Sequence, residues 1–259
     1  MADWQVITGD CLEVMRGMDA GSVDAVITDP PYSSGGFTET AKRQAKGQGL
    51  RSETIREVGW FINDNMGSAG AVWLMRSVAV ESARILKDGG SLCTFTDWRM
   101  VSHLLPAMES SGLRAQNLIV WDKGSPGLGV GFRPQHELIM HFVKGVGRFH
   151  AHDGRNVISS KRIHSLDKSH QTEKPVRLMM ELIRIVSPPY GVILDPFTGS
   201  GSTGCASVNL LCHFIGIEIS EDYADIARAR IAKAAEQARQ LELGIEREGA
   251  DMKRPNGGF

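Results

Sequence analysis

The sequence predicts an α/β protein with a doubly wound, mostly parallel sheet. Short β-rich runs alternate with longer runs in which apolar residues recur at helical spacing, and this alternation is typical of parallel strands joined by helices. One apolar strand near residue 192 also leads into a glycine-rich turn and a helix. The 259 residues are 42% hydrophobic and 23% charged. They contain no apolar run of about 18 residues, so we expect a globular protein without a membrane span.

The strands are predicted from short runs of apolar and β-branched residues. The run DAVIT, for example, is stopped by Asp29-Pro30-Pro31, because proline cannot continue the hydrogen-bond ladder of a sheet. Strands are expected at residues 4–8, 24–28, 91–96, 113–121, 137–143, 192–194 and 213–217.

The helices are predicted from apolar residues that recur every three or four positions. The run Lys87–Gly90 (KDGG) indicates a helix stop, and Pro175 suits a first helical turn. Helices are expected from residue 11 and at 56–86, 98–110, 175–187, 203–209 and 221–243.

These elements predict one discontinuous core, formed by residues 1–123 and 170–245. Residues 33–55 begin with a polar stretch that lacks an apolar period, and we expect a mobile loop there. Residues 124–169 include a polar, basic stretch and are expected to form an insert on the core. The tail at 246–259 contains a proline and a glycine pair, and it is expected to be flexible.

The charge of the chain is unevenly distributed. The formal net charge is −1, which by itself argues against a nucleic-acid partner. From Lys123 to Lys174, however, nine Lys and Arg residues face four Asp and Glu residues, which leaves an excess of 9 − 4 = +5. Six of the eight histidines also lie in this segment. The protein therefore carries a basic segment on a near-neutral body, and a polyanionic partner is plausible for that segment.

The cysteine and histidine spacings predict neither a disulfide framework nor a metal site. The four cysteines lie apart without CxxC spacing, and the pair His150 and His152 lacks accompanying cysteines or helical spacing. The N-terminal run MADWQVITGDCLEVM has no signal-peptide pattern. We therefore expect a protein of the reducing cytoplasm.

The segment Val192–Gly204 (VILDPFTGSGSTG) predicts a site for a nucleoside cofactor. Its glycines allow close approach of the backbone to a ligand, and the following helix offers exposed N–H groups. Glu218, at the end of the next strand, is suited to hydrogen bonding with ribose hydroxyls. The pattern GSGSTG also fits G-x-G-x-x-G, so NAD and S-adenosylmethionine both remain candidates, as does a structural glycine turn.

The tetrapeptide Asp29-Pro30-Pro31-Tyr32 predicts chemistry on an amino group. The nitrogen of a base amine is a poor nucleophile because its lone pair is delocalised into the ring. Two acceptors on its hydrogens, the Asp29 carboxylate and the Pro30 carbonyl, would favour a pyramidal and nucleophilic nitrogen. The prolines hold the backbone rigid, and Tyr32 offers a stacking face for a base. A proline-stiffened strand exit with a surface tyrosine is the structural alternative.

Together these motifs resemble the DNA amino-methyltransferases that make N6-methyladenine or N4-methylcytosine. The DPPY motif precedes the DPFTGSGSTG motif, an order that resembles the permuted beta group of that family. Residues 9–12 (GDCL), 83–90 (ARILKDGG), 119–123 (IVWDK), 136–137 (HE) and 170–175 (HQTEKP) resemble further family segments. The resemblance leaves residues 144–169 and the last dozen residues unmatched, and it implies a Rossmann-like methyltransferase fold.

The resemblance implies S-adenosylmethionine as the cofactor and no metal. Glu218 is expected to hold the ribose, Asp10 the adenine amine, and Thr172 with Lys174 the methionine moiety. The full set of expected cofactor residues is Asp10, Cys11, Thr172, Lys174, Asp195, Pro196, Phe197, Gly199, Ser200, Gly201, Ser202 and Glu218.

The same resemblance implies double-stranded DNA as the substrate, with a base flipped out of the duplex. Asp29, Pro30, Pro31 and Tyr32 are the expected catalytic residues. The mobile loop and the basic insert, which corresponds to a target-recognition region, are expected to contact DNA through Lys42, Arg43, Lys46, Arg51, Lys123, Arg133, Arg155, Lys161 and Arg162.

An aspartate in the first position of DPPY favours adenine N6 as the target, and cytosine N4 is the alternative. An RNA or protein-glutamine methyltransferase is disfavoured by the motif order and by Asp29. A dehydrogenase is disfavoured because its chemistry has no use for DPPY. A DNA-binding module without activity is disfavoured because both motifs are intact. A homodimer and a companion restriction endonuclease are further partners that the resemblance suggests.

Overall fold

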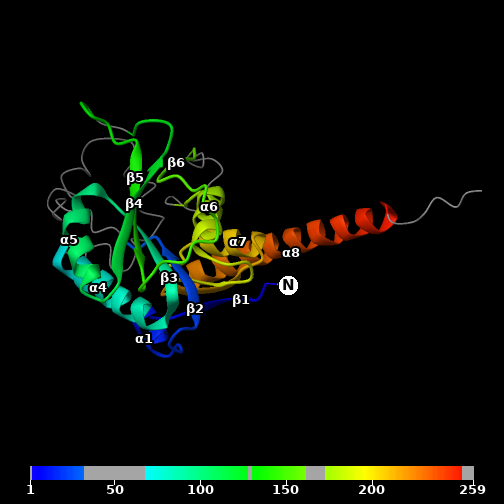
Figure 1. Ribbon diagram of the computed structural model, residues 1–259, viewed down its shortest axis with the longest axis horizontal. Helices are drawn as coiled ribbons and strands as arrows, with labels where there is room; N and C mark the ends of the chain where they lie inside the picture. Colours follow the sequence, from blue (N-terminus) through cyan, green and yellow to red (C-terminus); the bar gives the residue numbers. More distant parts are fainter. Residues whose placement is uncertain (1, 32–67, 128–129, 162–172, 253–259) are drawn as a thin grey trace, which may run out of the picture.

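One eight-stranded sheet organises the chain. The computed structural model describes residues 2–31, 68–127, 130–161 and 173–252. Its strands are β1 (Trp4–Thr8), β2 (Val23–Thr28), β3 (Leu86–Thr96), β4 (Arg114–Asp122), β5 (His136–Val143), β6 (Val157–Ser159), β7 (Val192–Asp195) and β8 (His213–Glu218). Its helices are α1 (Cys11–Arg16), α4 (Ser68–Ile85), α5 (Trp98–Glu109), α6 (Val176–Val186), α7 (Ser202–Asn209) and α8 (Glu221–Met252) (Figure 1).

The sheet is mostly parallel, with the strand order β1-β8-β7-β2-β3-β5-β4-β6. The first five strands in that order are parallel, whereas β5 is antiparallel to both of its neighbours. In the centre, β2 pairs with β7 through Ala25–Ile193 and Val26–Leu194, so an early and a late part of the chain meet there. The predicted fold class is confirmed.

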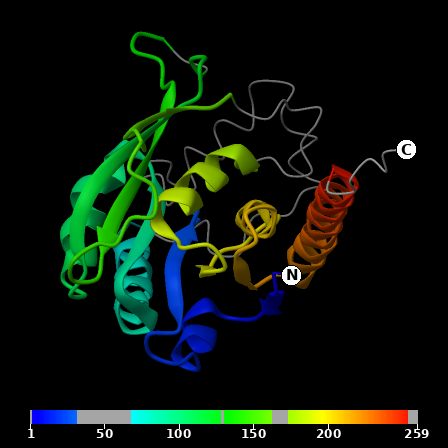
Figure 2. The same cartoon turned by 45° about the vertical axis from the view of Figure 1, so that its right-hand side comes forward.

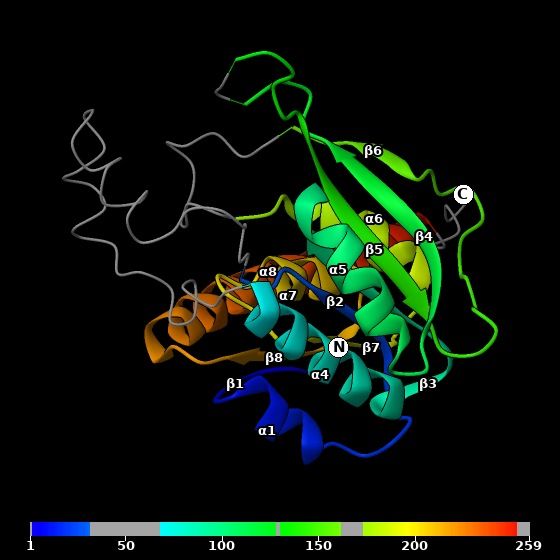
Figure 3. The ribbon, with the colours of Figure 1, turned by 90° about the vertical axis from the view of Figure 1, so that its left-hand side faces the viewer.

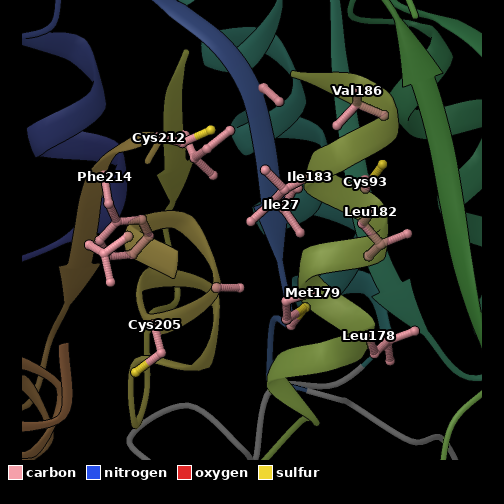
Figure 4. Close-up of a cluster of buried hydrophobic side chains, with 14 of the residues drawn as sticks. Ile27, Cys93, Leu178, Met179, Leu182, Ile183, Val186, Cys205, Cys212 and Phe214 are labelled. Carbon is pink, nitrogen blue, oxygen red and sulfur yellow. The ribbon is translucent and has the colours of Figure 1, made fainter. Parts of the chain in front are cut away.

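Helices cover both faces of this sheet. Figure 3 shows α1, α4 and α5 on the near face, and Figure 2 shows α6, α7 and α8 (yellow-green to red) on the opposite one. Each layer has its own apolar cluster against the sheet. In Figure 4 the buried side chain of Ile183 in α6 lies beside Ile27 of β2. Burial of such a side chain contributes about 1.5–3 kcal/mol, so α6 holds β2 firmly from one face.

Strand β6 was not predicted, and three predicted elements differ from the structure. Strand β3 begins at Leu86, so the KDGG run lies within the strand, and the pairing with β2 shifts register there. Helix α8 continues to Met252, beyond its predicted end at 243. No proline lies between residue 243 and Pro255, so no residue in this stretch breaks the helix by lacking a backbone N–H. Strand β5 falls within the range 124–169, yet it lies between β3 and β4, so this part of the expected insert belongs to the core sheet.

Candidate active site

The candidate site lies at the edge of the sheet where the parallel strands end. In parallel sheets with helices on both faces, ligands bind outside the carboxyl ends of the strands. Here β1 ends before Asp10, β2 before Asp29, β7 at Asp195 and β8 at Glu218. The Thr28 hydroxyl donates to Asp195 Oδ1 over 2.7 Å and ties the ends of β2 and β7 together. The fold therefore brings the predicted catalytic motif next to the predicted cofactor motif.

The three glycines of the GSGSTG loop occupy different environments. Gly199 and Gly201 have φ values of +51° and +84°, a region that side chains disfavour. No atom of the described residues lies within 4 Å of a Cβ placed on Gly199, whereas a Cβ on Gly201 would lie 3.1 Å from Ala227 of α8. Gly204 also packs against α8, through Ile231. Gly199 therefore faces open space, and the other two glycines allow α7 and α8 to approach closely.

Glu218 supports the glycine loop from the adjacent strand. Its carboxylate accepts hydrogen bonds from the backbone N–H groups of Gly199 (2.9 Å) and Ser220 (3.0 Å). Its own backbone carbonyl accepts one from Gly9, which precedes Asp10. The carboxylate is half-buried beside the open side of Gly199. This position is compatible with the predicted contact to a ribose.

Asp10 begins helix α1. Its Oδ1 atom accepts from the N–H groups of Leu12 (2.9 Å) and Glu13 (3.0 Å), which is an N-cap. The next residue, Cys11, is buried, and burial together with the nearby Asp10 charge raises the pKa of its thiol to about 12. Asp10 itself is exposed at the site edge. Its expected contact with an adenine amine stays a prediction, as does the cofactor contact of Cys11.

Asp195 is a buried carboxylate that links three elements. It accepts hydrogen bonds from Thr28 of β2, from Thr203 of α7 (2.6 Å) and from the Phe197 N–H (3.1 Å). Burial raises the pKa of Asp195 to about 6, against these hydrogen bonds, and the charge of Asp29 adds to the rise. The structure gives Asp195 a bracing role inside the protein, and a direct contact with a cofactor stays a prediction.

The remaining loop residues divide between packing and polar contacts. Pro196 is buried, and Phe197 is half-buried against the apolar cluster under α4 and α5. Ser200 is held by Arg230 of α8, whose Nη1 lies 2.6 Å from its carbonyl and 2.7 Å from its hydroxyl oxygen. Within the described ranges the buried hydroxyl of Ser202 has no hydrogen-bond partner.

The catalytic motif emerges from β2 at the same edge. Pro30 is buried and Pro31 is half-buried, and Tyr32 lies outside the described residues, as does the expected cofactor residue Thr172. The Asp29 carboxylate forms an ion pair with Lys174, which lies just before α6. Sequence reasoning assigned Lys174 to the cofactor, and that contact stays a prediction; the structure pairs Lys174 with the predicted catalytic acid.

This ion pair is one link in a chain of four alternating charges, Asp29, Lys174, Glu137 and Lys123. Lys174 Nζ lies 3.2 Å from Glu137 Oε2 in an ion pair rather than an aligned hydrogen bond. The other carboxylate oxygen of Glu137 lies 2.5 Å from Lys123 Nζ. Lys174 has only 6% of its side chain exposed and lies 5.0 Å from the centre of the Phe95 ring. We call this set the ionic chain.

Electrostatics hold both inner members of the ionic chain in their charged forms. Burial lowers the pKa of Lys174, but Asp29 and Glu137 outweigh it, so that pKa lies above its ordinary value. Burial raises the pKa of Glu137, but Lys174 and Lys123 outweigh it, so that pKa lies below its ordinary value. Each charge is therefore maintained by its oppositely charged neighbours.

The structure separates the expected DNA contacts into three groups. Arg133, Arg155 and Lys161 are exposed and available to a polyanion. Lys123 is not, because it is 13% exposed and paired with Glu137. The third group lies outside the described residues and comprises Lys42, Arg43, Lys46, Arg51 and Arg162.

Not all of the basic segment faces solvent. His141 is buried beside Ser91, and burial together with Arg114 lowers its pKa to about 4. This histidine is therefore neutral and belongs to the core. The Lys144 ammonium donates to the Leu86 carbonyl over 2.7 Å.

Sequence reasoning missed Glu137 and Arg230 as members of the site. The sequence feature that could have indicated Glu137 is a charged residue at the start of an apolar strand, HELIMHFV. Arg230 gave no such signal, because α8 alternates charges along much of its length. Arg230 joins the glycine loop to Glu173, with which it forms an ion pair.

Comparisons with known proteins agree with this geometry. A family model described as DNA methylase, for N6 and N4 methylation, matches residues 23–229. YubD of Escherichia coli (strain K12), which carries the name of a methylase, is 30% identical over 236 residues, 90% of this chain and 92% of that protein.

Two solved structures share the fold. The M1.HpyAVI–SAM complex has a TM-score of 0.63 and 24% identity, over 88% of this chain and 98% of that one. The PvuII DNA methyltransferase, described as cytosine-N4-specific, has a TM-score of 0.70 and 16% identity, over 92% of this chain and 93% of that one.

Proposed function

The chain belongs to the N6/N4 DNA methylase family, and from this premise we propose that it transfers a methyl group from S-adenosylmethionine to N6 of adenine. One observation carries the assignment to the residues. The Asp29-Pro30 step and the glycine loop lie at one edge of the sheet, joined by the hydrogen bond from Thr28 to Asp195. An acceptor pair for an amine thus lies next to a loop suited to a nucleoside.

The residues at the ends of β7 and β8 fit such a cofactor. The open side of Gly199 leaves room for a ligand, and Glu218 lies beside it as an acceptor for ribose hydroxyls. S-adenosylmethionine supplies a methyl group that its sulfonium already activates. The protein's contribution is then to align the acceptor nitrogen with that methyl group.

Asp29 and Pro30 would act on the target amine. The carboxylate and the carbonyl each accept one N–H of the amine, which directs the nitrogen lone pair toward the methyl group. Pro30 and Pro31 limit the backbone to an extended form, so these acceptors keep their direction. As the N–C bond forms, the bond between the methyl carbon and sulfur would break and S-adenosylhomocysteine would leave. One nitrogen proton would become acidic at that point, and Asp29 would accept it. Lys174 forms an ion pair with the same carboxylate.

Adenine is favoured over cytosine by Asp29. In this family, cytosine enzymes more often begin the catalytic motif with serine, so the aspartate supports adenine. Cytosine N4 remains the second candidate, since a cytosine-N4-specific enzyme shares the fold.

The experiment is a transfer assay with labelled S-adenosylmethionine and unmethylated double-stranded DNA. The DNA is then digested to nucleosides and analysed by mass spectrometry. The proposal expects N6-methyladenine, whereas N4-methylcytosine would support the second candidate. Absence of both, with cofactor bound, would contradict the proposal.

Two variants assign the roles. Asp29→Ala should bind cofactor normally and lose methyl transfer, and turnover near the wild-type rate would contradict the role of Asp29. Glu218→Gln should weaken cofactor binding, because the amide removes one acceptor for ribose and with it the hydrogen bond from the N–H of Gly199 or Ser220. Asp88→Asn, an exposed acid at the opposite end of the sheet, is the matched control and should change neither property.

Partners other than DNA stay predictions. Gel filtration tests the homodimer, and cleavage assays in source-cell extracts test the companion endonuclease. Among the described residues, no helix combines the length and the apolar character that crossing a bilayer requires. The cytoplasmic location is likewise a prediction.

A further inference from the structure

The ionic chain combines charge, burial and position in a way that stability alone does not explain. Lys174 is buried and the other three members are half-buried, so the chain carries a desolvation penalty, and apolar residues of similar volume would often be as stable or more so. One aromatic ring also lies beside each ammonium group, Phe95 beside Lys174 and Trp121 beside Lys123. Charged groups of this kind at a candidate active site are candidates for functional roles.

The geometry of the chain points toward Asp29. Its four members come from different elements: the end of β2, the segment before α6, the start of β5 and the end of β4. Lys174 contacts Asp29 through Oδ2 on one side and Glu137 through Oε2 on the other. An ammonium held between two carboxylates has a defined position, whereas one with a single partner can swing with that partner.

Asp29 also lies near a second carboxylate. Its charge acts on Asp195, which is buried at the end of the adjacent strand. Two carboxylates close together in a water-poor site oppose each other's ionisation. Without a cation, protonation would relieve this repulsion, and a protonated Asp29 could no longer accept an N–H of the target amine or take up its proton.

We propose that Lys174 and Glu137 are positioning residues for Asp29. Lys174 fixes the direction and the negative charge of the Asp29 carboxylate, and Glu137 anchors Lys174 from the other side. Lys123 forms the last ion pair of the ionic chain and balances the negative charge of Glu137. This inference rests on the proposed function, because it assumes that Asp29 acts on the target amine.

Removing the charge of Lys174 tests whether it acts on Asp29, because a merely structural role would not change the pH profile of methyl transfer. Lys174→Met leaves Asp29 near Asp195 and Glu137 without the cation between them, so protonation becomes easier. The acidic limb of the pH profile of methyl transfer should then move to higher pH. Each unit of movement lowers the rate below the limb by about tenfold. The double variant Glu137→Gln/Lys174→Met also removes the Glu137 carboxylate. Its acidic limb should therefore lie part of the way back toward the wild-type position.

Together with the single variant Glu137→Gln, these variants form a double-mutant cycle. Lys174→Arg keeps the charge and should keep the limb near its wild-type position. Lys87→Met is the matched control, because Lys87 pairs with Asp24 over 2.8 Å at the opposite end of the same strand β2. Circular dichroism and cofactor affinity are measured for every variant, so that misfolding and loss of cofactor are recognised.

Two results would overturn the inference. The first is a Lys174→Met profile that keeps the wild-type limb while cofactor binding falls, which would make Lys174 a cofactor contact. The second is a double variant whose limb coincides with that of Lys174→Met. A carbon-13 NMR titration of the Asp29 carboxyl, assigned with Asp29→Asn, follows the same shift without methyl transfer. It separates failure of this inference from failure of the proposed function.

Discussion

Replacing Gly201 by alanine should destabilise the fold more than the same change at Gly199. Both glycines have positive φ, so alanine costs about 1–2 kcal/mol of backbone strain at each. A smaller offset, about 0.4–1 kcal/mol, comes from the reduced entropy of the unfolded chain. Only Gly201 adds a packing term, because its new Cβ would lie 3.1 Å from Ala227 Cα and Cβ. Overpacking of this kind costs about 1–3 kcal/mol.

The difference between the two variants isolates the contact of the loop with α8. Urea denaturation followed by circular dichroism gives both free energies of unfolding, and we expect Gly201→Ala to be lower by about 1–3 kcal/mol. Cofactor titration should show the reverse order of effects, because the Gly199 Cβ would project into the open side of the loop. Equal stabilities of the two variants would refute the reasoning, since they would mean that α8 does not confine Gly201.

Three further perturbations follow from buried polar groups. The pKa of Asp195, raised to about 6, exceeds that of an unfolded aspartate, so the folded state binds more protons between about pH 4 and 6. The free energy of unfolding therefore falls as pH rises through that window, by up to about 1.4 kcal/mol per pH unit. In Asp195→Asn this pH dependence of the free energy of unfolding should vanish, which urea denaturation at pH 4.5 and 6.5 measures. The same difference in free energy between the two pH values as in the wild type would contradict the prediction. Arg230→Met should lower the thermal stability by leaving Glu173, 7% exposed, without this ion pair, and Arg230→Met/Glu173→Gln should recover part of the loss. All four cysteines are buried, and burial raises the pKa of Cys11 and Cys93 to about 12, so a thiol reagent at pH 8 should label the native protein slowly and the denatured protein at four sites.

Sequence reasoning succeeded where local pattern and local chemistry agree. The strand at Trp4–Thr8 was predicted with its observed bounds, and the strands before Asp29 and Asp195 were within one residue. Apolar runs stopped by proline or glycine specify such elements without tertiary information. Because parallel strands end at one edge, the observed sheet brings the two motifs together.

Sequence reasoning failed where a residue's role depends on a distant partner. Lys123 was predicted to contact DNA and Lys174 to contact the cofactor, and only the meeting of β4, β5 and the segment before α6 shows that Glu137 pairs with both. His141 lay in a basic segment, yet the pairing of β5 with β3 places it against Ser91 in the core. Strand β6 is three residues long, too short for a periodic signal, and depends on its pairing with β4.

The meeting of β2 and β7 in the middle of the sheet has a consequence for synthesis on the ribosome. Thr28 and Asp195, which join these strands, are 167 residues apart in the chain. At about 5–20 residues per second, translation takes roughly 10–30 s to cover that separation. During this interval β2 has no partner on its β7 side, and an unpaired apolar strand edge is prone to aggregate. We therefore expect chains cut short before residue 192 to accumulate as insoluble material or to be degraded, and an intact C-terminal third to be required for the N-terminal catalytic motif to become soluble at all.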